Sequence, residues 1–407
     1  MCGIAGFCNF KEDFEENTDY WNFRLEKMRA VLAHRGNDAR GRYLKKHIGL
    51  SHSRLAIRDI LCGDQPMTRT HNGYEYTICY NGEIYNTDEL IPELSENGFV
   101  CSTTSDTEVI LYAYIHWGAD FVNRLNGIFA FAIWDAAKSR LLLYRDRVGV
   151  KPLFYAIRGD SLVFGSEPKA CFAHPAVKPE LDKQGLQELL AIGPAHTSGL
   201  SLFKDLFEVL PGHFMIYSRD GLHDETYWEL TSREHTESYW DTVAHTRFLV
   251  EDAIKRQMVS DVPVCTFLSG GIDSSIVTAI AANYMNTRGK TLNTFSFDFK
   301  DNDRYFKANA FQPERDLPYV NRMLEEYETA HSYLECDENS LFKALFAAVD
   351  AKDMPGMTDV DSSLLYFCSL VSRKNKVALT GECADEIFGG YPWFRLLYTS
   401  PSPRAPK

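Results

Sequence analysis

The 407-residue sequence contains no apolar run that approaches the ~20 residues needed for a membrane-spanning helix. Its first ten residues, MCGIAGFCNF, have no basic segment and soon become polar, unlike a secretory signal peptide. Positive charge is also scarce, because 43 basic residues stand against 56 acidic ones and the formal net charge is -13. Broad binding to nucleic acid or anionic membranes requires concentrated positive charge. We therefore expect a cytoplasmic protein that binds neither nucleic acid nor membranes.

Cysteine pairs of the kind that bind zinc or form redox motifs are missing as well. The ten cysteines show no CxxC pair and no zinc-ligand spacing. Several, such as Cys79 in TICY and Cys265 in VPVCTFL, lie in apolar, strand-like runs, where a free cysteine behaves as a small buried hydrophobic residue. We expect a reducing compartment and mostly inert thiols. Cys2 is the exception because of its position.

The length predicts two or three domains, and a hydrophobic content of 45% is enough to build their cores. Over the first ~210 residues, short apolar strand patterns alternate with a few helical ones, at 21–33 and 106–118, which favours a layered α+β domain. From residue 243, helix and strand patterns alternate, which is typical of a doubly wound parallel α/β sheet. The predicted organisation is an N-terminal domain over 2–212, a linker over 213–242, an α/β domain over 243–395 and an unstructured tail over 396–407.

Cys2 is the first candidate functional residue. If Met1 is removed, Cys2 carries both a thiol and a free α-amino group, whose pKa near ~8 suits it as a general base. Arg54 offers a planar fork for a substrate carboxylate. Asn81 and Gly82 can donate to an oxyanion, and Asp106 can bind an ammonium group. Taken singly, Arg54 could equally be a surface charge, Asn81-Gly82 a hairpin turn and Asp106 a helix N-cap.

Two further motifs follow predicted strands in the α/β region. SGGIDSS (269–275) lies between a strand and a helix, where backbone N–H groups favour a phosphate, and Asp273 in place of a Walker lysine suggests magnesium. TGECADE (380–386) places three carboxylates at the end of another strand, where doubly wound sheets bind ligands. The alternatives are an ordinary glycine-rich turn for the first motif and a solvated acidic turn for the second.

The motifs together resemble one family. In order, they are MCGIAGF, HRGNDARG, RLAIRD, YNGEIYN, SDTE, NGIFAFAIWD, RDRVGVKPLFY, FGSEPKA, LSGGIDSS and TGECADEIFGGY. This series closely resembles glutamine-hydrolysing asparagine synthetase of the B type, from residue 2 to about residue 394. The resemblance implies an αββα N-terminal-nucleophile glutaminase domain, a class II glutamine amidotransferase, followed by a PP-loop ATP pyrophosphatase domain.

The resemblance also implies roles for individual residues. In the first domain, Cys2 is the nucleophile and Asn81 with Gly82 forms the oxyanion hole. Glutamine is bound at its carboxylate by Arg54, with the backbone of Leu55, Ala56, Ile57 and Arg58, and at its amino end by Glu83 and Asp106. In the second domain, the ATP-contacting positions are Leu268, Ser269, Gly270, Gly271, Asp273, Ser274, Ser275, Phe297, Thr380 and Gly381. Glu382 is needed to form the β-aspartyl-AMP intermediate, and Asp273 and Asp385 bind Mg2+.

The activity implied is ATP-dependent synthesis of asparagine from aspartate in the cytoplasm. Ammonia is released from glutamine through a cysteinyl thioester, travels through a tunnel and attacks β-aspartyl-AMP, giving glutamate, AMP and pyrophosphate. The substrates are small molecules, the cofactors are ATP and Mg2+, and a homodimer is expected.

The sequence departs from the family pattern at three places. Asn37 replaces a common proline, and Thr380 and Cys383 stand where the commoner motif reads S-G-E-G. The family pattern stops at about Phe394, whereas family members continue and supply a catalytic lysine from that region. We expect a fragment. A related ligase with another carboxylate acceptor, or a fragment limited to glutaminase activity or ligand binding, remains an alternative.

Overall fold

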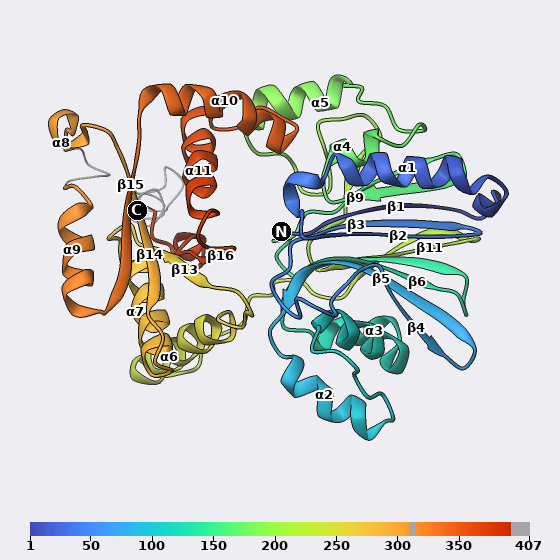
Figure 1. The fold of residues 1–407 in the computed structure, drawn as a ribbon, viewed down its shortest axis with the longest axis horizontal. Coiled ribbons are helices and arrows are strands. Elements are labelled where there is room, and N and C mark those ends of the chain that lie inside the picture. Colours follow the sequence, from blue (N-terminus) through green and yellow to red (C-terminus); the bar gives the residue numbers. More distant parts are fainter. Residues whose placement is uncertain (309–313, 392–407) are drawn as a thin grey trace, which may run out of the picture. The chain divides into compact units, whose positions relative to one another are not determined.

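The computed structural model describes residues 1–308 and 314–391, so the expected tail over 396–407 lies outside the described residues. The chain forms two compact units (Figure 1). The first contains Met1–His235 together with Ala347–Thr358, and the second contains Thr236–Phe346 and the chain from Asp359 onward.

The first unit is built on two six-stranded antiparallel sheets. One sheet has the order β10 (Phe207–Glu208), β8 (Phe154–Arg158), β9 (Ser161–Gly165), β1 (Gly3–Asn9), β3 (Ile48–Arg54) and β2 (Ala39–Lys45). The other has the order β12 (Gly221–Thr226), β11 (His213–Ser218), β7 (Arg140–Arg145), β6 (Gly127–Asp135), β5 (Tyr74–Ile84) and β4 (Met67–His71). The helices of the same chain segment are α1 (Thr18–Ala30), α2 (Thr87–Glu96), α3 (Asp106–Trp117), α4 (Pro168–Phe172) and α5 (Lys183–Gln187).

Side chains pack on both faces of each sheet, since successive side chains of a strand point to opposite sides. In β6, Phe131 packs in the core under α2 and α3, whereas the neighbouring Ala132 packs in the core between the two sheets. In β1, Phe7 packs against α1, and Cys8 faces the other sheet. Helices therefore cover the outer face of each sheet, as Figure 1 shows, and the predicted αββα architecture is confirmed.

The predicted linker over 213–242 does not match the structure. Strands β11 and β12 lie inside it, and β11 pairs with β7 from Phe214 opposite Tyr144 to Tyr217 opposite Leu141. Phe214, Met215 and Tyr217 are buried, so this segment completes the second sheet. The apolar run over 214–217 is only four residues long and is followed by the mostly polar stretch 218–226, so the pattern favoured a linker. The first unit accordingly continues to His235.

The second unit contains a four-stranded, fully parallel sheet with the order β15-β14-β13-β16, which confirms the predicted doubly wound domain. β13 lies between β14 and β16, so the chain connections run in opposite directions on its two sides, as at a topological switch point. The strands are β13 (Val264–Phe267), β14 (Leu292–Phe299), β15 (Thr329–Cys336) and β16 (Val377–Leu379). The helices of this chain segment are α6 (Tyr239–Arg256), α7 (Ile272–Asn286), α8 (Asn302–Tyr305), α9 (Leu317–Glu326), α10 (Glu338–Lys352), α11 (Thr358–Val371) and α12 (Ala384–Phe388).

Among the residues that the structure describes, no helix combines the length and the hydrophobicity needed to cross a membrane.

Candidate active sites

Cys2 lies directly before β1, a central strand that pairs with β3 on one side and with β9 on the other. The Leu55 backbone N–H points to the Cys2 sulfur at 3.4 Å, and the thiol donates to the Leu55 carbonyl oxygen at 3.6 Å. Burial raises the pKa of the Cys2 thiol, although the Leu55 hydrogen bond and the nearby N-terminal amine partly oppose this shift. The thiol is therefore mostly protonated at neutral pH and needs a base to become a nucleophile.

The chain's α-amino group, here on Met1, lies close to the Cys2 thiol, although Met1 as a whole is half exposed. Burial, together with the positive charges of Arg35 and Lys151, lowers the pKa of this amine to about 5. Lys151 Nζ lies 3.0 Å from the Met1 sulfur, and burial also lowers the pKa of Lys151. Sequence analysis assigned no role to Lys151. The available signal was a single lysine within the apolar stretch GVKPLFY.

Asn81 and Gly82 lie inside strand β5, so the hairpin-turn alternative is wrong. Asn81 is 1% exposed, and its side-chain Nδ2 is buried without a hydrogen-bond partner. Buried polar atoms in proteins are nearly always paired, so this free donor needs an explanation. Gly82 is required by packing, because a Cβ there would lie 2.3 Å from the Ile128 carbonyl oxygen of the neighbouring strand.

The half-buried Glu83 and the buried Asp106 form a pair of carboxylates, and the Glu83 charge acts on the Cys2 thiol. Burial raises the pKa of both groups, and the Asp106 charge raises that of Glu83 further. Asp106 Oδ2 accepts from the Tyr80 hydroxyl at 2.8 Å and from the Ile84 backbone N–H at 3.0 Å. Ser105, not Asp106, is the N-cap of α3, so the N-cap alternative is wrong.

Arg58 was expected to contribute only its backbone, but its side chain has a role in the same place. Its Nη1 donates to the Ile84 carbonyl oxygen at 2.8 Å and lies 4.0 Å from Asp106 Oδ2. Its Nη2 donates to the Thr87 hydroxyl at 3.2 Å. The guanidinium therefore fixes the end of β5 and offsets part of the carboxylates' negative charge. Tyr80, which sequence analysis also missed, directly precedes the predicted pair Asn81-Gly82.

Arg54 is buried, which excludes its reading as a surface charge. Its Nη1 donates to the Ile60 carbonyl oxygen at 3.1 Å and to Asp64 Oδ1 at 3.0 Å, and its Nη2 donates to the Arg58 carbonyl oxygen at 3.3 Å. The guanidinium thus organises the loop after β3 and already binds one carboxylate. Of the other residues expected there, Leu55 contacts Cys2, the Ala56 N–H donates to Asp38 Oδ2 at 2.8 Å, and Ile57 is half-buried.

The two motifs of the second unit lie side by side at the switch point. The 269–275 loop joins β13 to α7, and the 380–386 segment follows β16, the strand next to β13. A Cβ on Gly381 would lie 2.7 Å from the Ser274 backbone nitrogen and 2.9 Å from the Asp273 Cβ. Gly270 has φ +86°, a left-handed conformation that favours glycine. The two loops are therefore in direct contact at the carboxyl ends of two parallel strands.

Serine side chains hold the first loop in shape. The Ser274 hydroxyl lies 3.0 Å from the Ser269 hydroxyl and donates to the Gly271 carbonyl oxygen at 3.1 Å, and the Ser275 N–H donates to the same oxygen at 3.0 Å. Burial and the charge of Asp385 raise the pKa of Asp273, so the two carboxylates face the same region. Magnesium is commonly bound by one or two carboxylates together with substrate phosphates, and this pair fits that pattern.

The remaining positions expected to contact ATP differ in accessibility. Leu268 is 1% exposed; its N–H donates to the Phe295 carbonyl oxygen at 2.8 Å, and its carbonyl oxygen accepts from Ser296 Oγ at 2.6 Å. Phe297 is half-buried on β14, with its ring centre 5.2 Å from that of Phe367.

The acidic segment after β16 includes a constrained backbone position. Thr380 and Gly381 are half-buried, and Glu382 is exposed. Cys383 has φ +70°, a left-handed conformation that glycine adopts without cost and other residues rarely adopt. This explains why the commoner motif has glycine there.

Comparisons with known proteins agree with both halves of this description. Residues 1–228 match the family described as glutamine amidotransferase domain, and residues 245–406 match asparagine synthase. With the αββα fold, these matches define a glutamine amidotransferase domain joined to an asparagine synthase domain. The chain is 49% identical over 395 residues to asparagine synthetase [glutamine-hydrolyzing] 3 of Bacillus subtilis, covering 97% of this chain and 64% of that protein.

Two other relatives are about equally distant. A putative asparagine synthetase [glutamine-hydrolyzing] 2 of Methanocaldococcus jannaschii is 32% identical over 419 residues, covering 96% of this chain and 76% of that protein. Amidase chyE of Penicillium rubens is 32% identical over 413 residues, covering 97% of this chain and 60% of that protein. The chain belongs to the family of glutamine-hydrolysing asparagine synthetases. It spans less than two thirds of the length of the Bacillus subtilis relative.

Proposed function

We propose that the protein to which this chain belongs makes asparagine from aspartate with ammonia taken from glutamine. The Cys2 thiolate attacks the side-chain amide carbon of glutamine, the C–N bond breaks and ammonia leaves, carrying the proton that the thiol gave up. Water then hydrolyses the γ-glutamyl thioester to glutamate. In the second unit, the aspartate side-chain carboxylate attacks the α-phosphorus of ATP and pyrophosphate leaves. Ammonia displaces AMP from the β-aspartyl-AMP intermediate, giving asparagine.

The observation that carries the proposal is the free Asn81 amide. Its buried Nδ2 has no hydrogen-bond partner, and it lies in the same strand as Glu83, whose charge acts on the Cys2 thiol. A donor kept free in a buried site can stabilise an oxyanion as soon as one forms, since no existing hydrogen bond has to break. Gly82 would supply the second donor from its backbone.

The general base is the α-amino group of Cys2 after Met1 has been removed. The amine now in this place has its pKa lowered to about 5 by burial, so an amine here is neutral at pH 7 and can accept a proton. Burial also raises the thiol pKa, so the proton is transferred to the amine only as the sulfur attacks the amide carbon.

Glutamine is recognised by charge at both ends of its backbone. Burial raises the pKa of both Glu83 and Asp106, and the Asp106 charge adds to the shift of Glu83 although Arg58 opposes it; an α-ammonium group would favour the ionised form of both. Arg54 Nη1, which now donates to Asp64 Oδ1, would donate to the α-carboxylate of glutamine instead.

ATP would bind where the two loops of the second unit meet, with Ser269 to Ser275 around the pyrophosphate and Thr380 and Gly381 beside it. Leu268 and Phe297 are the proposed adenosine contacts, and Glu382 the carboxylate that assists adenylation. Asp273 and Asp385 would hold Mg2+, which neutralises the charge of the phosphates. We place the reaction in the cytoplasm, in agreement with ten free cysteines, and by family resemblance we propose a homodimer.

The test is a reaction of the purified chain, with Met1 removal verified by mass, containing amide-15N glutamine, aspartate, ATP and Mg2+. We expect glutamate, 15N-asparagine and AMP in equal amounts. Glutamate without asparagine or AMP would restrict the chain to a glutaminase. No glutamate from Met1-free protein would refute the assignment of Cys2.

A second candidate keeps the glutaminase and changes the acceptor. The similarity to a protein named amidase chyE over nearly the whole chain favours testing it. The same reaction with other carboxylates in place of aspartate distinguishes the two, because AMP forms only with the correct acceptor.

A further inference from the structure

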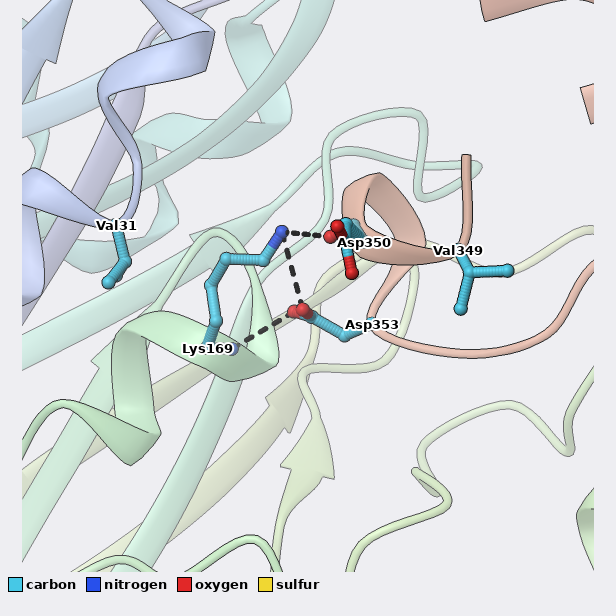
Figure 2. A pocket seen from close by; sticks show the side chains of 5 residues that line it. All are labelled: Val31, Lys169, Val349, Asp350 and Asp353. Atoms are coloured by element: carbon cyan, nitrogen blue, oxygen red, sulfur yellow. Dashed lines mark hydrogen bonds and ion pairs between the residues drawn. The ribbon is translucent and has the colours of Figure 1, made fainter. Parts of the chain in front are cut away.

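Residues 347–358 belong to the first compact unit, although they lie within the range that matches asparagine synthase. They comprise the end of α10 and the chain that follows it. An open cavity of about 500 Å³ is lined there by Val31, Lys169, Val349, Asp350 and Asp353. Figure 2 shows the Lys169 side chain extending from α4 toward Asp350 and Asp353.

Lys169 binds this segment at three points. Its backbone N–H donates to Asp353 Oδ2 at 3.0 Å, and its Nζ lies 3.3 Å from Asp353 Oδ1. The same Nζ donates to the Asp350 carbonyl oxygen. Asp353 has φ +58°, a left-handed conformation that directs its carboxylate from a tight turn. The backbone N–H and the side-chain ammonium group of Lys169 thus both contact the Asp353 carboxylate.

The ammonium group of Lys169 also reaches toward Cys2. It lies 3.1 Å from Glu167 Oε2, while Glu167 Oε1 accepts from Arg35 Nη1 at 2.6 Å. Arg35 Nε in turn donates to the Cys2 carbonyl oxygen at 2.8 Å. Three side chains therefore connect residues 347–358 to the backbone of the proposed nucleophile.

The middle of this connection is buried and ionised. Glu167 and Arg35 are both buried. Burial by itself would raise the pKa of Glu167, but hydrogen bonds from His34 and Arg35 and the Arg35 charge lower it to about 2. Lys169 contacts Glu167 Oε2, whereas Arg35 and His34 contact Oε1. Without Asp353, the Lys169 ammonium group would pair with Glu167 alone, and the shift of this carboxylate toward Lys169 would weaken its hydrogen bond to Arg35.

We propose that Asp353 and Lys169 act as positioning residues, and that seating of residues 347–358 on Lys169 sets the position of Cys2 through Glu167 and Arg35. This inference rests on the proposed role of Cys2 in glutamine hydrolysis. It makes glutaminase activity dependent on a segment from the sequence of the synthetase half.

The test variant is Asp353→Asn, because asparagine keeps the side-chain shape and tolerates left-handed backbone but lacks the charge. The matched control is Asp205→Asn. Asp205 also has a left-handed backbone, with φ +56°, and pairs with Arg158 at 2.7 Å in the same unit. The full chain is used, with Met1 removed.

Two readouts are measured. The first is glutamate release, from which kcat and KM for glutamine are obtained. The second is the rate at which iodoacetamide alkylates Cys2, followed by mass spectrometry of the N-terminal peptide, with exposed Cys62 as internal reference. We expect D353N to lower kcat and Cys2 alkylation on the order of tenfold, since small displacements of a reacting group have effects of this size or larger, with KM nearly unchanged. D205N should match the unmodified protein.

Lys169→Met interrupts the same connection at its other residue and should lower kcat and Cys2 alkylation to the same extent. The double variant should be no worse than either single one, because both interrupt one connection. The proposal is overturned if D353N and D205N give equal kcat and equal Cys2 alkylation, or if the D353N and K169M losses simply multiply. If the unmodified protein releases no glutamate, the proposed function fails, whereas the rate of Cys2 alkylation still tests whether Asp353 and Lys169 position Cys2.

Discussion

Replacing Asn81 should separate activity from stability, because its side-chain amide lacks the hydrogen bond that would stabilise the fold. Asn81→Leu keeps a similar volume at a position that is 1% exposed. No hydrogen bond of Nδ2 is lost, and removal of an unsatisfied buried donor offsets a penalty of about 1–3 kcal/mol. We expect the free energy of unfolding to stay the same or to rise by about 1 kcal/mol. Loss of one oxyanion donor should lower kcat by roughly 10²- to 10³-fold.

Asn86 supplies the matched control. It is also buried, 7% exposed, but its Nδ2 donates to the Arg124 carbonyl oxygen at 2.9 Å and its Oδ1 accepts from the Asn126 N–H at 2.8 Å. Asn86→Leu should therefore lose about 1–3 kcal/mol of stability while kcat changes by less than about threefold.

Urea unfolding and initial rates of glutamate release at saturating glutamine measure the two effects. The reasoning is refuted if N81L unfolds as easily as N86L and keeps its kcat.

Three other predictions follow from the described groups. Because the pKa values of Glu83 and Asp106 are raised, the pair takes up a proton as the pH falls through these values, and KM for glutamine should rise toward acidic pH. Glu83→Gln should raise KM and flatten this pH dependence. A pH-independent KM in the unmodified protein would contradict an ammonium site. Asp64→Ala should lower KM up to about fivefold, because the ion pair that occupies Arg54 is lost; its Asp64 carboxylate is largely exposed, so the pair is worth ~1 kcal/mol at most, and an increase in KM would show that Asp64 supports the site. Cys383→Gly should stabilise the second unit by about 1 kcal/mol in urea unfolding, since Cys383 has φ +70°, whereas destabilisation would mean that the thiol makes a needed contact.

Local patterns predicted a layered α+β domain and a doubly wound α/β domain, whereas the αββα arrangement of the first was predicted from the family resemblance. Helix α3 and all four strands of the parallel sheet follow from periodicity and from breaks at glycine, and Cys2, Arg54, Asn81 and Asp106 were recognised from residue type and motif. The strands β11 and β12 were missed because the apolar run of β11 is short and the edge strand β12 is mostly exposed. The pairing of β11 with β7 also depends on residues about 70 positions earlier.

The supporting residues were harder to predict, because their roles depend on pairings distant in sequence. Tyr80 and Asp106 are 26 residues apart, and Lys169 and Asp353 are 184 apart. A lysine or tyrosine carries no sign of such a partner in its own neighbourhood. Likewise, motif spacing gives no indication that Asn81 Nδ2 lacks a partner, since this requires knowing every atom around it.

The path of the chain through the two compact units limits how they can be exchanged. The chain leaves the first unit after His235, returns to it for Ala347–Thr358 and leaves again. A single recombination event near residue 235 would therefore transfer a first unit that lacks the segment bound by Lys169. A functional transplant needs a recipient that supplies a compatible segment about 110 residues further along its own sequence. The two halves are therefore expected to be inherited together, and changes at Lys169 should be accompanied by changes at Asp353.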